Sequence, residues 1–307
     1  MDAKITRREV ILGSLAALPL TLGARPAQRV SRMRFGFTTY TWGKEWDIPT
    51  IIANCTRAKA LGVELRTSGQ YAHGVELELG EAGRGEAKKR FADSPVTLVG
   101  LACAEKFDHP DPAKLKAAVE NAKGFAKLSH DVGGRGVRVF PNDFQKGVPE
   151  EKTIEQIARS LNEVGKYAAG YKQMIRLENH GGAGRLTTLR KIMDQVTEKN
   201  VRIKLNCDAR DNEGGNFESN FNLVKGFLGD TLHMHDLRDE KFPYQLQTNL
   251  LIDMGWEGWW LVEESTKVPD RVQALIELRQ SFESLVAKSL SRQIKGSLYS
   301  SPPPFLD

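Results

Sequence analysis

The chain of 307 residues contains only three cysteines, Cys55, Cys103 and Cys207. Three scattered cysteines exclude a disulfide framework and a thiolate zinc cluster, because both need more cysteines at closer spacing. We expect each of the three to be a buried apolar residue. The glycine clusters at residues 133–136, 181–184 and 213–215 lack the full G-x-G-x-x-G pattern. They predict turns rather than a dinucleotide-binding loop.

A basic excess is absent from the body of the chain. The sequence has 44 Lys and Arg against 39 Asp and Glu, and its first 34 residues hold seven of the basic and two of the acidic groups. The remainder therefore carries 37 charges of each sign. Proteins that bind nucleic acids usually carry a basic excess on the folded body. We therefore expect no nucleic-acid partner, and the hydrophobic fraction of 40% excludes wholesale disorder.

The N-terminus contains an apolar run that is short of a membrane span. Residues 10–24 are uncharged and mostly apolar, whereas a transmembrane helix needs about 20 such residues. Arg7 and Arg8 precede the run, and the combination resembles a twin-arginine signal peptide. We expect a signal over residues 1–27, cleaved near residues 24–27, and export to the bacterial periplasm through the twin-arginine machinery. A chance basic pair before an ordinary N-terminal helix is the alternative.

Beyond residue 33, short β-rich runs alternate with longer helical patterns. The strand-like runs cover residues 34–42, 63–68, 96–105, 136–143, 173–180, 201–208, 231–237 and 259–265. Helical patterns lie between them, and a final helix is expected from about Pro269 to Lys288. Strict alternation predicts parallel strands joined by right-handed crossovers.

Eight such units in about 255 residues favour a (β/α)8 TIM barrel in the α/β class, built as a single domain. We place the barrel at residues 34–289 and a C-terminal tail at residues 290–307, of which we expect residues 300–307 to be extended. An open doubly wound sheet is the alternative, but it would require a glycine-rich phosphate loop after an early strand.

Ligand-type side chains recur near the ends of four consecutive expected strands. The active site of such a barrel lies at these carboxyl ends. The residues are Glu178, Asp208, His233 and Glu263. Their spacings of 30, 25 and 30 residues each correspond to about one strand-helix unit, so we expect the four side chains to converge on one sector of the rim.

Three carboxylates and one imidazole suit one hard or borderline divalent ion. Mn²⁺ is the expected ion, with Mg²⁺, Co²⁺ and Zn²⁺ as alternatives. Three carboxylates around one divalent ion would leave the site mildly anionic.

The runs RLENHGG, KLNCDARDN, LHMHDLRD and GWEGWWLVEES resemble the xylose-isomerase-like barrel superfamily of sugar isomerases and epimerases. The resemblance extends from about Arg34 to Lys288. It implies that Glu178, Asp208, His233 and Glu263 bind one divalent ion. Ketose 3-epimerases of the superfamily use the two metal-bound glutamates as acid and base, which implies catalytic roles for Glu178 and Glu263.

Further residues are expected to contact the substrate. The resemblance places Glu64 near the barrel mouth, whereas Asp211 and His235 stand where many epimerases have a histidine and a lysine. These departures bear on the substrate and the reaction. Trp42 could stack on a sugar ring, and Glu264 is the alternative to Glu263 as a ligand. The substrate-binding set that we expect is Trp42, Glu64, His180, Asp211, His235 and Arg238.

The function expected from these residues is proton abstraction beside a carbonyl of a small-molecule carbohydrate, giving a sugar isomerase or epimerase. β-Elimination from an oxidised 3-keto glycoside, a lyase reaction, is an alternative that suits a periplasmic enzyme. A carbohydrate-binding barrel without catalysis is a second alternative. An apurinic endonuclease would need three zinc ions and many more histidines. The sequence leaves the choice between a monomer and a homo-oligomer open.

Overall fold

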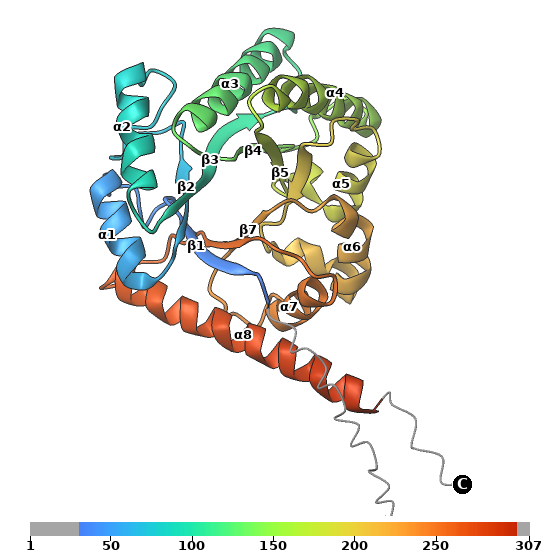
Figure 1. Ribbon diagram of the computed structural model, residues 1–307. Coiled ribbons are helices and arrows are strands. Elements are labelled where there is room, and N and C mark those ends of the chain that lie inside the picture. Colours follow the sequence, from blue (N-terminus) through green and yellow to red (C-terminus); the bar gives the residue numbers. More distant parts are fainter. Residues whose placement is uncertain (1–30, 300–307) are drawn as a thin grey trace, which may run out of the picture. The chain divides into compact units, whose positions relative to one another are not determined.

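The computed structural model describes residues 31–299, and eight parallel strands form the centre of this part of the chain (Figure 1). The strands are β1 (Arg34–Thr38), β2 (Gly62–Arg66), β3 (Thr97–Lys106), β4 (Gly136–Phe140), β5 (Met174–Glu178), β6 (Val201–Lys204), β7 (Thr231–Met234) and β8 (Trp259–Val262). Their order in the sheet is β6-β5-β4-β3-β2-β1-β8-β7. The strands β6 and β7 then meet through the His233 amide, which donates to the Leu205 carbonyl at 2.8 Å. This contact brings the two ends of the sheet together and produces a nearly closed barrel.

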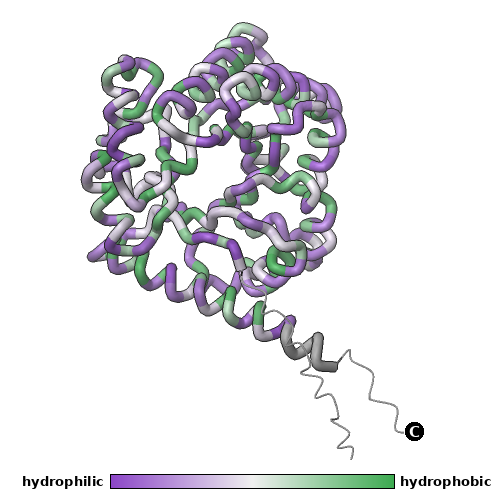
Figure 2. Tube along the Cα trace, in the orientation of Figure 1, coloured by the Kyte–Doolittle hydropathy of each residue, from purple (hydrophilic) through white to green (hydrophobic). Residues whose placement is uncertain are grey.

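Helices connect successive strands and surround the barrel (Figure 1). They are α1 (Ile48–Ala58), α2 (Glu81–Ala92), α3 (Pro112–Asp131), α4 (Glu150–Ala169), α5 (Leu186–Met193), α6 (Phe217–Val224), α7 (Tyr244–Asp253) and α8 (Arg271–Tyr299). Hydrophobic and hydrophilic positions alternate along them in Figure 2. In α4 the buried residues include Ile154, Ile157, Leu161 and Val164, which share one helix face. The main hydrophobic core therefore lies between the helices and the outer side of the sheet. The fold is a single-domain (β/α)8 barrel, as the alternation predicted.

Local sequence explains where several helices begin. Asp47 caps α1 by accepting a hydrogen bond from the Thr50 amide at 2.9 Å. Asp111 caps α3 in the same way through the Ala113 amide at 2.8 Å, and Pro112 occupies the first turn. These caps satisfy amides that would otherwise have no partner at a helix start.

The structure differs from the predicted elements at their ends. Seven of the eight strands end two to four residues before the expected position. The last helix continues to Tyr299, so much of the tail expected at residues 290–307 is helical. The predicted signal, residues 1–27, lies outside the described residues. Within residues 31–299, no helix is both long enough and apolar enough to cross a membrane.

The bottom of the barrel interior holds a buried arginine instead of a purely apolar layer. The guanidinium of Arg176 bonds to Asp230 at 2.9 and 3.1 Å and to the Val99 carbonyl at 3.2 Å. A Cβ at Gly100 would lie 2.5 Å from Arg176 Nη1, and one at Gly136 would lie 2.9 Å from Cζ. The two glycines therefore leave the space that this side chain fills. The barrel interior therefore contains charged residues below the rim as well as at the site on the rim.

Candidate active site

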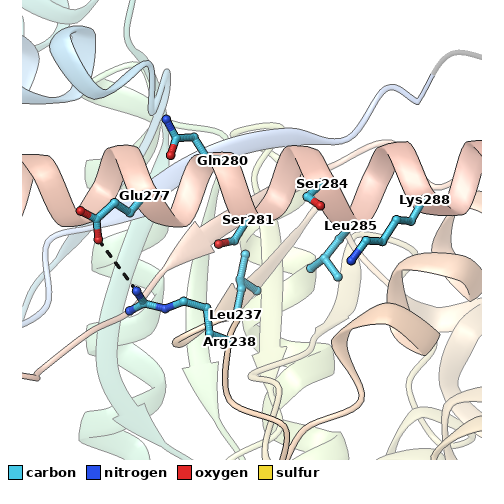
Figure 3. A pocket seen from close by; sticks show the side chains of 8 residues that line it. All are labelled: Leu237, Arg238, Glu277, Gln280, Ser281, Ser284, Leu285 and Lys288. Carbon is cyan, nitrogen blue, oxygen red and sulfur yellow. Dashed lines mark ion pairs between the residues drawn. The ribbon is translucent and has the colours of Figure 1, made fainter.

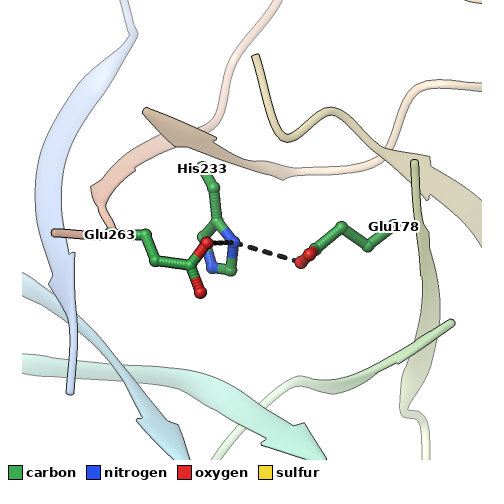
Figure 4. A group of neighbouring side chains, drawn as sticks. All are labelled: Glu178, His233 and Glu263. Carbon is green, nitrogen blue, oxygen red and sulfur yellow. Dashed lines mark ion pairs between the residues drawn. The ribbon is translucent and has the colours of Figure 1, made fainter. Parts of the chain in front are cut away.

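Three of the expected ligands come together at the carboxyl end of the barrel. Glu178 ends β5, His233 lies in β7, and Glu263 follows β8 directly. His233 Nδ1 lies 3.1 Å from Glu178 Oε2 and 3.3 Å from Glu263 Oε2. One donor atom from each residue lies within 4.8 Å of the other two. Figure 4 shows the imidazole between the two carboxylates, and all three side chains are buried.

Glu64 contacts the His233 imidazole on the side opposite Glu178 and Glu263. It lies in β2 with no exposed surface, and its Oε2 is 2.7 Å from His233 Nε2. Sequence comparison implied that Glu64 binds substrate near the mouth, whereas the structure buries it beneath the imidazole. A carboxylate on one ring nitrogen fixes the orientation of the ring and leaves the opposite nitrogen aimed at Glu178 and Glu263.

A buried lysine neutralises Glu64. The Lys204 ammonium, from β6, donates to both carboxylate oxygens of Glu64 at 2.6 and 2.7 Å. It also lies 2.7 Å from His233 Nε2. In a neutral ring Nε2 can either donate to Glu64 or accept from Lys204, but not both. Only the form with the proton on Nε2 leaves the Nδ1 lone pair free for a ligand.

Two arginines accompany the two rim glutamates. Arg138, in β4, is fully buried and its Nε lies 3.2 Å from Glu178 Oε2. Arg66 ends β2, and its Nη1 donates to Glu263 Oε1 at 3.1 Å. Each rim glutamate therefore has its own guanidinium, supplied by the adjacent strand β4 for Glu178 and by β2, two strands from β8, for Glu263.

These charges shift the pKa values of the central groups. Burial would raise the pKa of Glu178, but Arg138 and His233 outweigh burial and hold the pKa below its ordinary value. Burial is likewise outweighed at Glu263, where His233 lowers the pKa to about 2. At His233, burial lowers the pKa, but the carboxylates, led by Glu263, raise it to about 10. At neutral pH the glutamates are ionised and the imidazole holds a proton on each nitrogen.

The expected anionic character of the site is wrong. Three carboxylates do line the interior, but they are Glu64, Glu178 and Glu263, and each is paired with a cation. These three cations balance the three anions when His233 is neutral, which is the form that can bind an ion through Nδ1. Sequence reasoning missed the three cationic residues, which are Arg66, Arg138 and Lys204.

A signal for these cations is nevertheless present in the sequence. Arg66 is two residues after Glu64, so the two share one face of the strand. Arg138 interrupts an otherwise apolar strand pattern in GVRVF, and Lys204 lies between Ile203 and Leu205 in VRIKL, a strand pattern that also contains Arg202. A charged residue inside a buried parallel strand needs a partner. This requirement could have indicated a charged barrel interior.

Asp208 does not join the group of three. It caps a short 3₁₀ turn, Ala209–Gly215, and accepts from the Arg210 amide at 2.8 Å and from its Nε at 3.0 Å. Burial raises the pKa of Asp208, but Arg210 outweighs it and the net shift is downward. The fourth predicted ligand is therefore held by a neighbouring arginine.

The remaining predicted substrate residues lie in different surroundings. Trp42 is 3% exposed, packs in the main core and donates its indole N–H to the Thr266 carbonyl at 2.7 Å. His180 is exposed at the end of β5 with its ring 4.5 Å from that of Phe140.

Asp211 and His235, two further residues of the predicted substrate-binding set, have partners within the protein. Asp211 is buried and accepts from Asn179 Nδ2 at 2.8 and 3.0 Å. The ring nitrogens of His235 lie 2.7 and 3.1 Å from the carbonyls of Glu263 and Asn206.

Arg238 lies elsewhere, beside α8. Its side chain pairs with Asp236 at 2.7 Å and lies 3.8 Å from Glu277. It lines a hollow together with Leu237 and residues of α8, which Figure 3 shows. Apart from Leu237, its neighbours in this hollow come from α8, and none of them belongs to the group of three.

The group of three fits a divalent metal ion. Glu178 Oε2 and His233 Nδ1 are buried, yet neither has a hydrogen-bond partner among the described residues. Two carboxylates and one imidazole are a common donor set for borderline divalent ions. The Glu64 contact can hold the His233 proton on Nε2, as a ligating histidine requires. An ion would take the place of the Nδ1 proton between the two glutamates.

A protein-family model for xylose isomerase-like TIM barrels matches residues 52–285, which is more than half of the chain. The chain belongs to this family. No curated protein sequence matches it. Solved structures that resemble this xylose isomerase-like barrel share its fold at low sequence identity.

Three of these structures are matched over nearly their whole length. An L-ribulose 3-epimerase is 16% identical with a TM-score of 0.72, covering 88% of this chain and 100% of its own. The 3-keto-D-glucoside 4-epimerase YcjR from E. coli is 14% identical with a TM-score of 0.65, covering 83% and 99%. IolI with a bound zinc atom is 16% identical with a TM-score of 0.68, covering 85% and 99%.

Proposed function

We propose that this barrel is a divalent-metal-dependent sugar isomerase or epimerase that moves a proton on the carbon beside a carbonyl. The observation that carries the proposal is the placement of two glutamates on either side of His233 Nδ1, at 3.1 and 3.3 Å. Removing a proton from one face and returning it to the other needs two such groups. The epimerases named above, which have the same fold, support the substrate class.

Glu178 and Glu263 are suited to the proton transfer in different ways. The ionised carboxylate of one accepts the proton from the carbon and passes it to solvent, and the other takes a proton from solvent and delivers it to the opposite face of the carbon. Glu178 is held by a fully buried arginine, whereas the partner of Glu263 is partly exposed. The charge that develops on the carbonyl oxygen needs stabilisation by nearby positive groups.

Glu178, His233 and Glu263 would hold the metal ion, and Asp208 remains the predicted fourth ligand. A bound divalent ion supplies positive charge that polarises a carbonyl. Mn²⁺ is the ion that we propose, and the zinc atom bound to IolI makes Zn²⁺ the main alternative. Asp208 would have to release Arg210 to reach an ion.

Metal content of purified variants tests this ligand set. Dialysed protein is loaded with Mn²⁺ or Zn²⁺, washed and measured by elemental analysis. His233→Ala should lose nearly all bound ion, because the ring supplies the central donor. Asp208→Ala should bind more weakly than the wild type but better than His233→Ala, because its carboxylate gains a contact only by giving up Arg210. A full equivalent of ion in His233→Ala would overturn the ligand set, and unchanged affinity in Asp208→Ala would remove Asp208 from it.

Solvent exchange tests the chemistry. Ketohexoses and 3-keto glycosides are incubated with the metal-loaded protein in D₂O and followed by NMR. Deuterium should appear on the carbon beside the carbonyl, and Glu178→Gln or Glu263→Gln should reduce the rate by ~10²–10⁴-fold. Glu264→Gln is the matched control, because Glu264 is equally buried but bonds to Thr266 outside the group.

The product separates the alternatives. An epimer or an aldose–ketose pair identifies an isomerase, whereas an unsaturated sugar with a released aglycone identifies the lyase. The lyase alternative is supported by the likeness to an enzyme that acts on a 3-keto glucoside. Tight sugar binding without exchange or product would indicate a carbohydrate-binding barrel and would contradict the proposal.

A further inference from the structure

The charge count inside the barrel bears on the kind of sugar that the site accepts. Glu64, Glu178 and Glu263 are matched by three cations, so the interior has no net charge when His233 is neutral. A divalent ion held by the group would add two positive charges. Coulomb forces are strong in a water-poor interior. The loaded site would therefore favour an anionic substrate over a neutral one.

The three cations are not equally available to a substrate. Arg138 and Lys204 are fully buried, and each donates hydrogen bonds to groups of the barrel. Arg138 Nη1 donates to the Cys103 carbonyl at 2.8 Å, and Lys204 donates to Glu64. Arg66 differs, because its side chain is 19% exposed. Among the cations that pair with the site carboxylates, only Arg66 can meet a molecule that enters from solvent.

Arg66 also has an unused bidentate edge. Its Nη1 bonds to Glu263, whereas Nε and Nη2 have no partner within the described residues. These two N–H groups form the edge that pairs with a carboxylate through two parallel hydrogen bonds. The guanidinium carbon lies over the Tyr40 ring, 5.0 Å from its centroid.

The surroundings of Arg66 leave its charge incompletely compensated. Burial, and after it the nearby charge of Arg138, lowers the pKa of Arg66, while Glu263 and Glu178 oppose this shift. Tyr71 is the other titratable group that interacts with it. An anion on the free edge would offset the charge repulsion between the two arginines.

We propose that Arg66 binds a carboxylate of the substrate, so that the sugar processed here is a sugar acid. The inference rests on the proposed function and specifies its substrate class. Because Arg66 contacts Glu263 directly, the carboxylate lies beside the carbon on which the two glutamates act. Arg66 is thus a specificity-determining residue that also orients Glu263.

A binding comparison tests this without turnover. Methyl β-D-glucuronide and methyl β-D-glucoside share one ring and differ in a carboxylate against a hydroxymethyl group, and neither has a ketone to react. Their affinities for the Mn²⁺-loaded protein are measured by titration calorimetry and saturation-transfer NMR. The glucuronide should bind at least ~10-fold more tightly, as expected for one charge-assisted bidentate contact.

The variants assign the preference to one side chain. Arg66→Met should abolish the preference, and Arg66→Lys should retain part of it because the charge remains without the planar fork. Arg90→Met is the matched control, since Arg90 is exposed on α2 and pairs with Glu86 of the same helix. That variant should keep the full preference. The quantity compared between variants is the ratio of the glucuronide affinity to the glucoside affinity. A general loss of binding lowers both affinities and leaves this ratio unchanged.

The outcomes separate this inference from the proposed function. Equal binding of the two glycosides, failure of both to bind, or an undiminished preference in Arg66→Met overturns the sugar-acid inference. Loss of deuterium exchange with every keto sugar overturns the proposed function and leaves the binding preference as a separate result. Rapid exchange on neutral keto sugars together with equal binding overturns the inference alone.

Discussion

Glu64 holds His233 from the side opposite the candidate ion, with Oε2 and Nε2 2.7 Å apart and neither side chain exposed. The two residues lie on strands separated by 169 positions in the sequence. When Nε2 donates to this carboxylate, Nδ1 presents its lone pair toward Glu178 and Glu263. The contact thus decides which form of the imidazole faces the site.

Glu64→Gln should weaken metal binding by ~10–100-fold, because an amide oxygen orients the ring but lacks the charge that favours a proton on Nε2. The dissociation constant for Mn²⁺ or Zn²⁺ is measured by competition with a chelating dye, on protein whose folded state is verified by circular dichroism. Glu264→Gln is again the control and should bind like the wild type. Equal affinity of Glu64→Gln and the wild type would contradict the role that we assign to Glu64.

The Glu64–Lys204 pair should show strong energetic coupling. Either Glu64→Gln or Lys204→Met leaves a buried charge without its partner, which costs about 3–5 kcal/mol of unfolding free energy. The double variant removes both charges and should be markedly more stable than the sum of the two effects predicts. Urea unfolding of all four proteins, with metal removed, measures the coupling. Additive losses would indicate that the two groups do not interact in solution.

Asp211 should make stability depend on pH. Burial raises its pKa to about 8, against 3.8 for an ordinary aspartate. Between these values the native state holds a proton that the unfolded chain releases, so the unfolding free energy falls as pH rises, by at most ~1.4 kcal/mol per pH unit. Above pH 8 this contribution is constant. Asp211→Asn lacks the titration, so its stability relative to the wild type should increase from pH 5 to pH 8.

Urea unfolding of both proteins across that range isolates the effect, because other titrating groups contribute equally to each. Asp194→Asn serves as a control, since Asp194 is exposed and pairs with Arg190 on α5. A constant stability difference between wild type and Asp211→Asn would show that Asp211 ionises normally.

The arginine pair at residues 7 and 8 should direct export. Changing both Arg7 and Arg8 to Lys keeps the charge but removes the feature that the twin-arginine pathway recognises. Folded protein should then remain in the cytoplasm of a bacterial host, whereas the wild-type sequence yields periplasmic protein. Fractionation followed by immunoblotting measures the distribution. Undiminished periplasmic yield of the double variant would reject the signal.

Periodicity and spacing were sufficient to predict the barrel and three members of the site. Parallel strands place their carboxyl ends on one rim, so Glu178, His233 and Glu263 converge once the alternation of strands and helices is recognised. Strand alternation does not predict the direction of a side chain beyond the end of a strand, because the chain leaves the sheet there. Asp208 follows β6 by four residues and caps a turn, where strand alternation no longer governs its direction.

The charge of the site depended on tertiary structure. Sequence alternation identifies residues that share a strand face. In this barrel both faces of a strand are buried, so the sequence pattern does not distinguish the face that points into the barrel from the face that packs against the helices. Closure of the barrel brings Lys204 from β6 to Glu64 of β2, and Arg66 from β2 to Glu263, which follows β8. Local sequence therefore determined which residues stand at the rim. Only the closed barrel decided their partners, because pairing across the interior joins strands that are distant in the chain.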